Sequence, residues 1–320
     1  MQEMIVSKLK ALLNEGKVSR VIGWKKGETF YDQSPAVFES AEELEGFVYD
    51  DFSGANLSKF LIRETRKGGK VAVVLKPCDT FSLNQLIKEH RVERENIFVL
   101  GVPCEGKLSE EKLRDRGIVG LTGMKAQGEN VVVDTLYGSE SVKREDILLS
   151  KCECCHSKRH VIFDELLGEE GKDCDTDRFA RVTELENMTP DERYEFWRGE
   201  LSRCIRCNAC RNACPACTCE KCVFDNNDSG VAAKSNANEF EENMFHIIRA
   251  FHVTGRCTDC GECSRVCPQH IPLHLLNRKF IKDINTYYGE YQAGEDIDSE
   301  HPLIDYTEGD PEPSIVKEAK

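Results

Sequence analysis

The chain has 320 residues and a formal net charge of -14 at pH 7, so it has room for two domains, and its acidic balance argues against a nucleic-acid surface, which needs clustered Lys and Arg. Its longest aliphatic run, Val71 to Leu75, is too short for a signal-peptide core or a membrane span. We therefore expect a cytoplasmic protein with no membrane span and no nucleic-acid partner.

The first part of the chain alternates between helical and strand-like patterns. Apolar residues from Met4 to Leu13 share one face of a predicted helix, which Gly16 can end. Residues 17–24 and 29–38 predict short strands around a Lys-Gly turn, and residues 57–65 predict a second helix.

Two apolar runs then enclose a third helix. Residues 71–75 and 97–100 predict buried strands, with a helical segment from 80 to 90 between them. A strand, a helix and a strand in this order form a parallel unit. With a further strand at 131–133, in a hairpin, residues 1–150 are expected to form an α/β domain with a short parallel sheet.

Cysteine turns follow both of these buried strands. Cys78 lies in Lys-Pro-Cys-Asp and Cys104 in Val-Pro-Cys-Glu-Gly, so both are expected at the carboxyl edge of the sheet, where α/β proteins bind ligands. The N-terminus of the following helix would favour a Cys78 thiolate. Both are candidate cofactor-binding residues, the alternative being two small buried residues in tight turns. No glycine-rich nucleotide fingerprint occurs, so FAD would have to bind without one.

The later part of the chain is predicted in three segments. Residues 151–199 form a charged, cysteine-containing connector in which Thr189 and Pro190 mark a helix start. Residues 200–285 hold the main cysteine motifs and end in a helix from 271 to 284. Residues 286–320 form an acidic C-terminal tail that we expect to be poorly ordered.

Fifteen of the seventeen cysteines lie between residues 152 and 267. In a reducing cytosol so many cysteines indicate metal binding rather than structural disulfides. Two runs share the pattern Cys-x-x-Cys-x-x-Cys-x-x-x-Cys-Pro, which is typical of 4Fe-4S ligation. They are Cys204, Cys207, Cys210 and Cys214, and Cys257, Cys260, Cys263 and Cys267.

The last cysteine of each run is expected to reach the other cluster, as in two-cluster ferredoxins. Cluster 1 would then be held by Cys204, Cys207, Cys210 and Cys267. Cluster 2 would be held by Cys257, Cys260, Cys263 and Cys214. Zinc is the alternative metal, but structural zinc sites pair Cys-x-x-Cys units without a third evenly spaced cysteine and a terminal Cys-Pro.

The interval between the two runs contains a predicted helix, residues 240–253, with Met244, Ile247, Ile248 and Phe251 on one side. This arrangement resembles the α-helical ferredoxins of the succinate dehydrogenase and heterodisulfide reductase type, which hold two cubanes between helices. Five arginines among the ligands could raise the cluster potentials or be ordinary surface residues. They are Arg203, Arg206, Arg211, Arg256 and Arg265.

Six further cysteines lie in two tight groups. The groups are Cys152, Cys154 and Cys155, followed by His156, and Cys217, Cys219 and Cys222. They predict a third metal centre, either iron–sulfur or zinc. The alternative is a set of reduced, partly buried cysteines.

The order of these motifs, Lys-Pro-Cys78-Asp, Gly-Val-Pro-Cys104 and then a ferredoxin-like region, resembles the coenzyme F-420 hydrogenase/dehydrogenase β-subunit family. That resemblance implies an iron–sulfur electron-transfer subunit of an anaerobic redox complex. Its partners would be hydrogenase, formate dehydrogenase or heterodisulfide reductase-like subunits. The alternative is an enzyme, a flavin-dependent oxidoreductase acting on deazaflavin or another two-electron donor.

Overall fold

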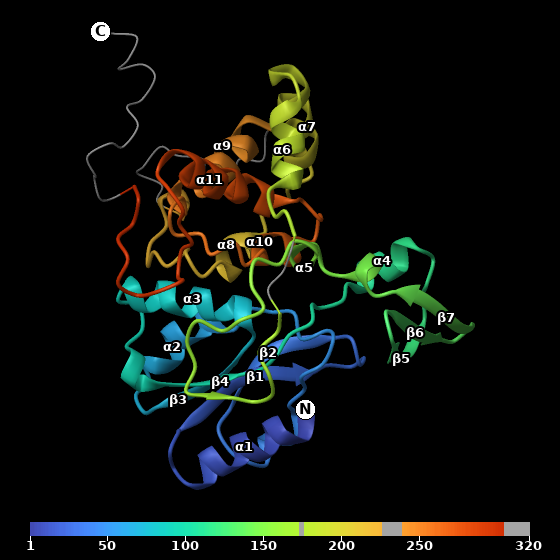
Figure 1. The fold of residues 1–320 in the computed structure, drawn as a ribbon, viewed down its shortest axis with the longest axis vertical. Coiled ribbons are helices and arrows are strands. Elements are labelled where there is room, and N and C mark those ends of the chain that lie inside the picture. The colour runs from blue at the N-terminus through green and yellow to red at the C-terminus, as the bar shows by residue number, and fades with distance from the viewer. Residues whose placement is uncertain (173–175, 226–238, 304–320) are drawn as a thin grey trace. The chain divides into compact units, whose positions relative to one another are not determined.

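The computed structural model describes residues 1–172, 176–225 and 239–303. The chain divides into two compact units, Met1–Thr176 and Asp177–Lys320, so the division lies within the predicted connector (Figure 1). Residues 304–320 of the predicted acidic tail lie outside the described residues. No helix in the described ranges is both long and apolar enough to cross a membrane.

The first unit is built on a five-stranded sheet of order β2-β1-β3-β4-β8. The strands are β1 (Arg20–Lys26), β2 (Gln33–Phe38), β3 (Val71–Leu75), β4 (Ile97–Gly101) and β8 (Glu165–Leu166). Only β2 runs antiparallel to its neighbour; the other pairs are parallel. All five residues of β3 are buried, as expected for a central parallel strand covered on both faces.

Helices cover this sheet on both sides, with α1 on one face and α3 on the other (Figure 1). The helices of the first unit are α1 (Gln2–Asn14), α2 (Leu61–Thr65), α3 (Pro77–Lys88), α4 (Glu110–Asp115) and α5 (Ser150–Glu153). Helix α1 buries Ile5, Leu9 and Leu12 at helical spacing, and the chain leaves it through Gly16, whose φ of 66° suits glycine. The predicted parallel β3-α3-β4 unit is therefore confirmed.

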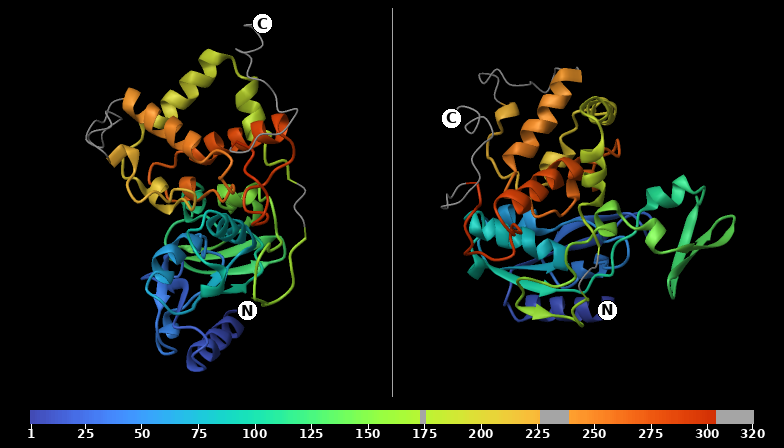
Figure 2. Two further views of the ribbon diagram at one scale, coloured as in Figure 1. Left: turned by 90° about the vertical axis from the view of Figure 1, so that its left-hand side faces the viewer. Right: turned by 45° about the horizontal axis from the view of Figure 1, so that its top comes forward.

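A smaller antiparallel sheet lies beside the main sheet of the first unit (Figure 2, right). It consists of β5 (Leu121–Gln127), β6 (Asn130–Thr135) and β7 (Gly138–Lys143). The predicted strand at residues 131–133 is thus the middle strand of three. Short 3-10 helices are found at Glu43–Gly46, Ser58–Phe60, Arg94–Asn96, Glu145–Ile147 and, in the second unit, Val223–Asp225.

The second unit contains helices and no strands among its described residues. Its helices are α6 (Ala180–Asn187), α7 (Pro190–Ser202), α8 (Ala209–Ala213), α9 (Glu239–His252), α10 (Glu262–Arg265) and α11 (Leu273–Tyr287). The predicted start of α7 is confirmed, because Thr189 and Glu192 form a reciprocal capping box and Pro190 occupies the first turn. The predicted fold class, an α/β part followed by a helical two-cluster part, is confirmed.

Candidate metal centres

The structure brings together the four cysteines predicted to hold cluster 1. Cys204, Cys207, Cys210 and Cys267 line one cavity in the second unit, with apolar walls from Phe245, Ile271 and Leu273. Cys204 and Cys207 come from the segment before α8 and Cys210 from α8 itself, whereas Cys267 follows α10. The last cysteine of the second run thus lies beside the thiols of the first run.

The cysteines predicted to hold cluster 2 also converge. Cys214 packs against Cys257 and Val253 in a buried apolar group. Burial, and after it the charges of Asp259 and Cys214, raise the pKa of Cys257 well above its ordinary value. Burial foremost, with Cys214 and Cys210 contributing, raises the pKa of Cys263 to about 12. Cys214 is therefore close to the thiols of the second run, although the ligand assignment itself stays a prediction.

The two cysteine runs share an unusual backbone shape. In each, the residues two and four positions after the first cysteine have a left-handed conformation: Arg206 and Asn208 with φ of 54° and 60°, and Asp259 and Gly261 with φ of 57° and 64°. Left-handed backbone is costly for a residue such as Arg, so surrounding contacts must maintain it. These positions wind the chain so that nearby thiols can face one centre.

Buried ion pairs hold both loops at matching positions. Arg206 Nε lies 3.1 Å from a Glu242 carboxylate oxygen on α9, and Arg278 Nε on α11 lies 3.0 Å from an Asp259 carboxylate oxygen. All four side chains are at least 95% buried. The charge signs are exchanged between the two loops, but each pair ties a cysteine loop to a long helix.

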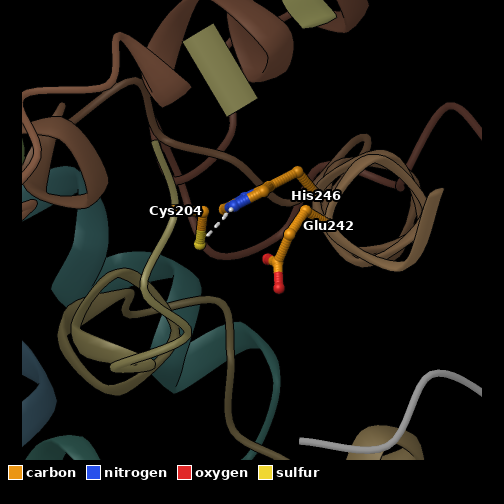
Figure 3. Close-up of side chains that lie close together, drawn as sticks. All are labelled: Cys204, Glu242 and His246. Atoms are coloured by element: carbon orange, nitrogen blue, oxygen red, sulfur yellow. Dashed lines mark hydrogen bonds between the residues drawn. The ribbon is translucent and has the colours of Figure 1, made fainter. Parts of the chain in front are cut away.

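Helix α9 faces the cysteines with a polar surface (Figure 3). His246 Nε2 is 3.2 Å from Cys204 Sγ, and Glu242 projects from the preceding turn of the helix. Among the described residues, only Cys204, Glu242 and His246 place three potential ligand atoms within 4.8 Å of one another. Burial, followed by the charges of Arg249 and Arg206, lowers the pKa of His246 to about 3, so the ring is neutral and can donate one hydrogen bond to sulfur.

This arrangement corrects the predicted orientation of the helix. Ile247 and Phe251, placed on its apolar side by periodicity, are 41% and 60% exposed. The buried face instead contains Glu242, Phe245, His246, Arg249 and Ala250. The polar and charged residues face inward because cysteine thiols lie beside this face of the helix, among apolar residues such as Phe224 and Leu273.

Four of the five arginines predicted to affect the clusters are paired with carboxylates. Arg206 pairs with Glu242, Arg203 with Glu200, Arg211 with Asp225 and Arg265 with Glu262. The fifth, Arg256, donates to the His252 carbonyl oxygen at 3.2 Å. Their positive charge is largely compensated locally, which weakens their expected effect on a nearby cluster.

Arg249 differs from these five arginines. It was not identified from the sequence as a residue near the clusters, because it lies in a helix outside the cysteine runs. It is 3% exposed, and none of its three guanidinium nitrogens has a hydrogen-bond partner among the described residues. Burial disfavours its charge, but Cys263, Cys210 and Cys214 raise its pKa above the ordinary value. A buried cation surrounded by thiols requires compensating negative charge, which cysteine-ligated 4Fe-4S clusters would supply.

The first unit contains a second group of cysteines. Cys152 lies beside Gly106, two residues after Cys104, and Cys155 is close enough to Cys78 to contribute to its raised pKa. Burial, followed by Asp79, raises the pKa of Cys78 well above its ordinary value, which opposes the expected thiolate at the start of α3. Lys107 N–H also donates to Cys152 Sγ at 3.3 Å.

Three lysines lie near this group of cysteines, and their side chains also hold the loop of residues 50–55. The ammonium groups of Lys76, Lys107 and Lys151 donate to the carbonyl oxygens of Ala55, Asp50 and Gly54, respectively, at 2.6–2.8 Å. Lys76 is also paired with Asp79 at 2.6 Å. Cationic surroundings suit thiolate ligands to a metal centre.

The remaining cysteines do not form one site in a single unit. Cys154 belongs to the first unit, whereas Cys217, Cys219 and Cys222 belong to the second. Cys217 packs beside Cys214, Cys222 interacts with Arg211, and Cys219 is exposed. Cys174 lies outside the described residues. The predicted third centre of six cysteines therefore stays a prediction.

Residues 200–271 match the family model of the 4Fe-4S dicluster domain. The chain carries a 4Fe-4S dicluster domain. This confirms the prediction of two 4Fe-4S clusters, whose all-cysteine donor sets and uncompensated buried Arg249 fit such groups.

Two curated relatives are similar over most of the chain. The F420-dependent formate dehydrogenase subunit beta of Methanocaldococcus jannaschii is 23% identical, and the alignment covers 88% of this chain and 89% of the relative. The F420-dependent formate dehydrogenase 1 subunit beta of Methanococcus maripaludis is 24% identical, covering 93% and 91%. The resemblance to the β-subunit family inferred from the cysteine turns and the ferredoxin region is confirmed.

A solved structure also shows a partial likeness. A chain in the F420-reducing [NiFe] hydrogenase complex of Methanosarcina barkeri is 17% identical, with a TM-score of 0.38, over 47% of this chain and 58% of that one.

Proposed function

We propose that this protein is the iron–sulfur electron-transfer subunit of a cytoplasmic formate dehydrogenase complex that uses coenzyme F420. The observation that carries the proposal is the approach of the two cysteine runs in the dicluster domain, where Cys267 shares a cavity with cysteines of the first run and Cys214 packs against Cys257. The full-length similarity to β subunits of F420-dependent formate dehydrogenases indicates the kind of complex. Hydrogenase and heterodisulfide reductase-like subunits are the alternative partners.

The residues around the cysteines prepare the site for one-electron chemistry. Bound 4Fe-4S clusters would supply reversible one-electron transfer. Apolar walls such as Phe245 border the cysteines of cluster 1, of which Cys210 is buried. His246 can donate a hydrogen bond to Cys204 Sγ, and Arg249 supplies positive charge, both of which favour the reduced form of a cluster.

A second candidate function is that of an enzyme in which the first unit binds a flavin or the deazaflavin itself. The observation that favours it is the group of cysteines and buried lysines after β3 and β4, at the sheet edge where α/β proteins bind ligands. The same group offers four thiols, Cys78, Cys104, Cys152 and Cys155, for a third cluster. In that case, this unit would pass electrons between the two-electron carrier and the dicluster domain.

Anaerobic purification from the native cells tests the main proposal. We expect the chain to accompany a formate dehydrogenase catalytic subunit, and the complex to reduce coenzyme F420 with formate. Isolation of a chain that binds zinc in place of iron would contradict the electron-transfer role. Flavin released on denaturation, together with F420 turnover by the isolated chain, would favour the enzyme instead.

A further inference from the structure

We propose that Arg249 is a cation shared by the two clusters, which raises the reduction potential of both. The inference deepens the proposed function and depends on it, since it requires both clusters to be bound. Unlike the arginines within the cysteine runs, Arg249 lies on α9, between the two sets of thiols.

The position of Arg249 follows from its neighbours along α9. Phe245, one turn before it, packs in the group that contains Cys210 and Cys263. Val253, in the turn that directly follows the end of α9, packs against Cys214 and Cys257. Residues four apart lie on the same side of a helix, so the Arg249 side chain points to the region between these contacts. That region contains cysteines predicted to bind each cluster.

The charge of Arg249 is not compensated by protein groups in the described part of the chain. No carboxylate or carbonyl oxygen pairs with its nitrogens there, and the side-chain group that interacts with it directly is the Cys263 thiol, a predicted cluster ligand. By contrast, Arg206 on the adjacent loop is held by Glu242 at 3.1 Å. An uncompensated charge acts strongly on its surroundings when it is buried, because the effective dielectric constant is low.

The sign of the effect follows from the electron balance. Reduction adds one electron, and hence one negative charge, to a cluster without forming or breaking a ligand bond. A nearby cation stabilises the more negative reduced form, so removal of the cation makes reduction harder. Because Arg249 lies near both cysteine sets, its removal should shift both potentials to more negative values.

The test compares Arg249→Met, Arg249→Lys and wild type in the full-length chain, purified anaerobically. Iron and acid-labile sulfide are measured first, and the midpoint potentials of both clusters follow from redox titration monitored by electron paramagnetic resonance. We expect Arg249→Met to shift both midpoints negative and Arg249→Lys, which keeps the charge, to shift them less. The control Arg203→Gln removes an exposed arginine next to Cys204, and its potentials should match wild type.

The outcomes separate this inference from the proposed function. Wild-type protein without two clusters would contradict the proposed function. Loaded Arg249→Met protein with both potentials unchanged, or with only one shifted, would overturn the shared-cation inference. If Arg249→Met fails to assemble clusters, the iron and sulfide content of Arg249→Lys decides between the two roles. A full complement of both clusters in Arg249→Lys supports the role of charge. Failure of both variants to assemble clusters overturns the shared-cation inference in favour of a packing role.

Discussion

Cys214 and Cys267 end the two cysteine runs, and each lies beside thiols of the other run. The spacing explains this exchange, because three residues and a following proline turn the fourth cysteine away from the first three. With the predicted ligand assignment, each cluster would depend on two distant parts of the sequence. A single substitution at either position can therefore affect the cluster of the opposite run.

Replacement of Cys214 by Ser tests this exchange. We expect the variant to lose or alter the cluster held mainly by Cys257, Cys260 and Cys263, because Cys214 would be its fourth ligand. The cluster of Cys204, Cys207 and Cys210 should keep its spectrum and potential. Electron paramagnetic resonance of the reduced protein resolves the two signals, with Cys219→Ser, an exposed cysteine outside both runs, as the control. Loss confined to the cluster of Cys204 would contradict the assignment.

At the scale of elements, the parallel β3-α3-β4 unit could be predicted because apolar runs and turn residues act locally. The buried face of α9 could not be predicted in the same way. A prediction from the spacing of Ile247 and Phe251 assumes that the helix packs against an apolar interior. Here cysteine thiols lie in the interior beside α9, and these favour inward-facing His246 and Arg249. Strand β8 was also missed, because its two residues are defined only by pairing with β4.

The start of α7 is a feature that the sequence did predict, and it has a measurable effect on stability. Thr189 accepts a hydrogen bond from the Glu192 N–H, and the Glu192 carboxylate accepts one from the Thr189 N–H at 2.9 Å. Thr189→Ala should lower the free energy of unfolding by about 1 kcal/mol. Thermal unfolding followed by helical circular dichroism measures the change. Thr286→Ala, an exposed threonine near the end of α11, should leave the midpoint almost unchanged and serves as the control.

At the scale of the whole chain, cysteines are distributed over both units. The second unit carries the dicluster domain, whereas the first has its own group of Cys78, Cys104, Cys152 and Cys155 around lysines. From the sequence, Cys152 and Cys155 were grouped with cysteines of the second unit and not with Cys78 and Cys104. Proximity between residues so far apart in the chain depends on the fold of the parallel sheet, which spacing alone does not reveal. Cys78 and Cys104 follow adjacent strands of that sheet.

Iron content distinguishes two clusters from three. The dicluster domain alone accounts for about eight iron atoms per chain, and a third cubane on the four cysteines of the first unit raises this to about twelve. We expect about twelve in anaerobically prepared protein, and about eight in Cys104→Ser, because three thiols without the fourth hold a cubane poorly. Cys154→Ser is the matched control, since Cys154 lies in the same short segment as Cys152 but outside the group of four. Eight iron atoms in wild type and in both variants would show that this group is made of packed, reduced cysteines.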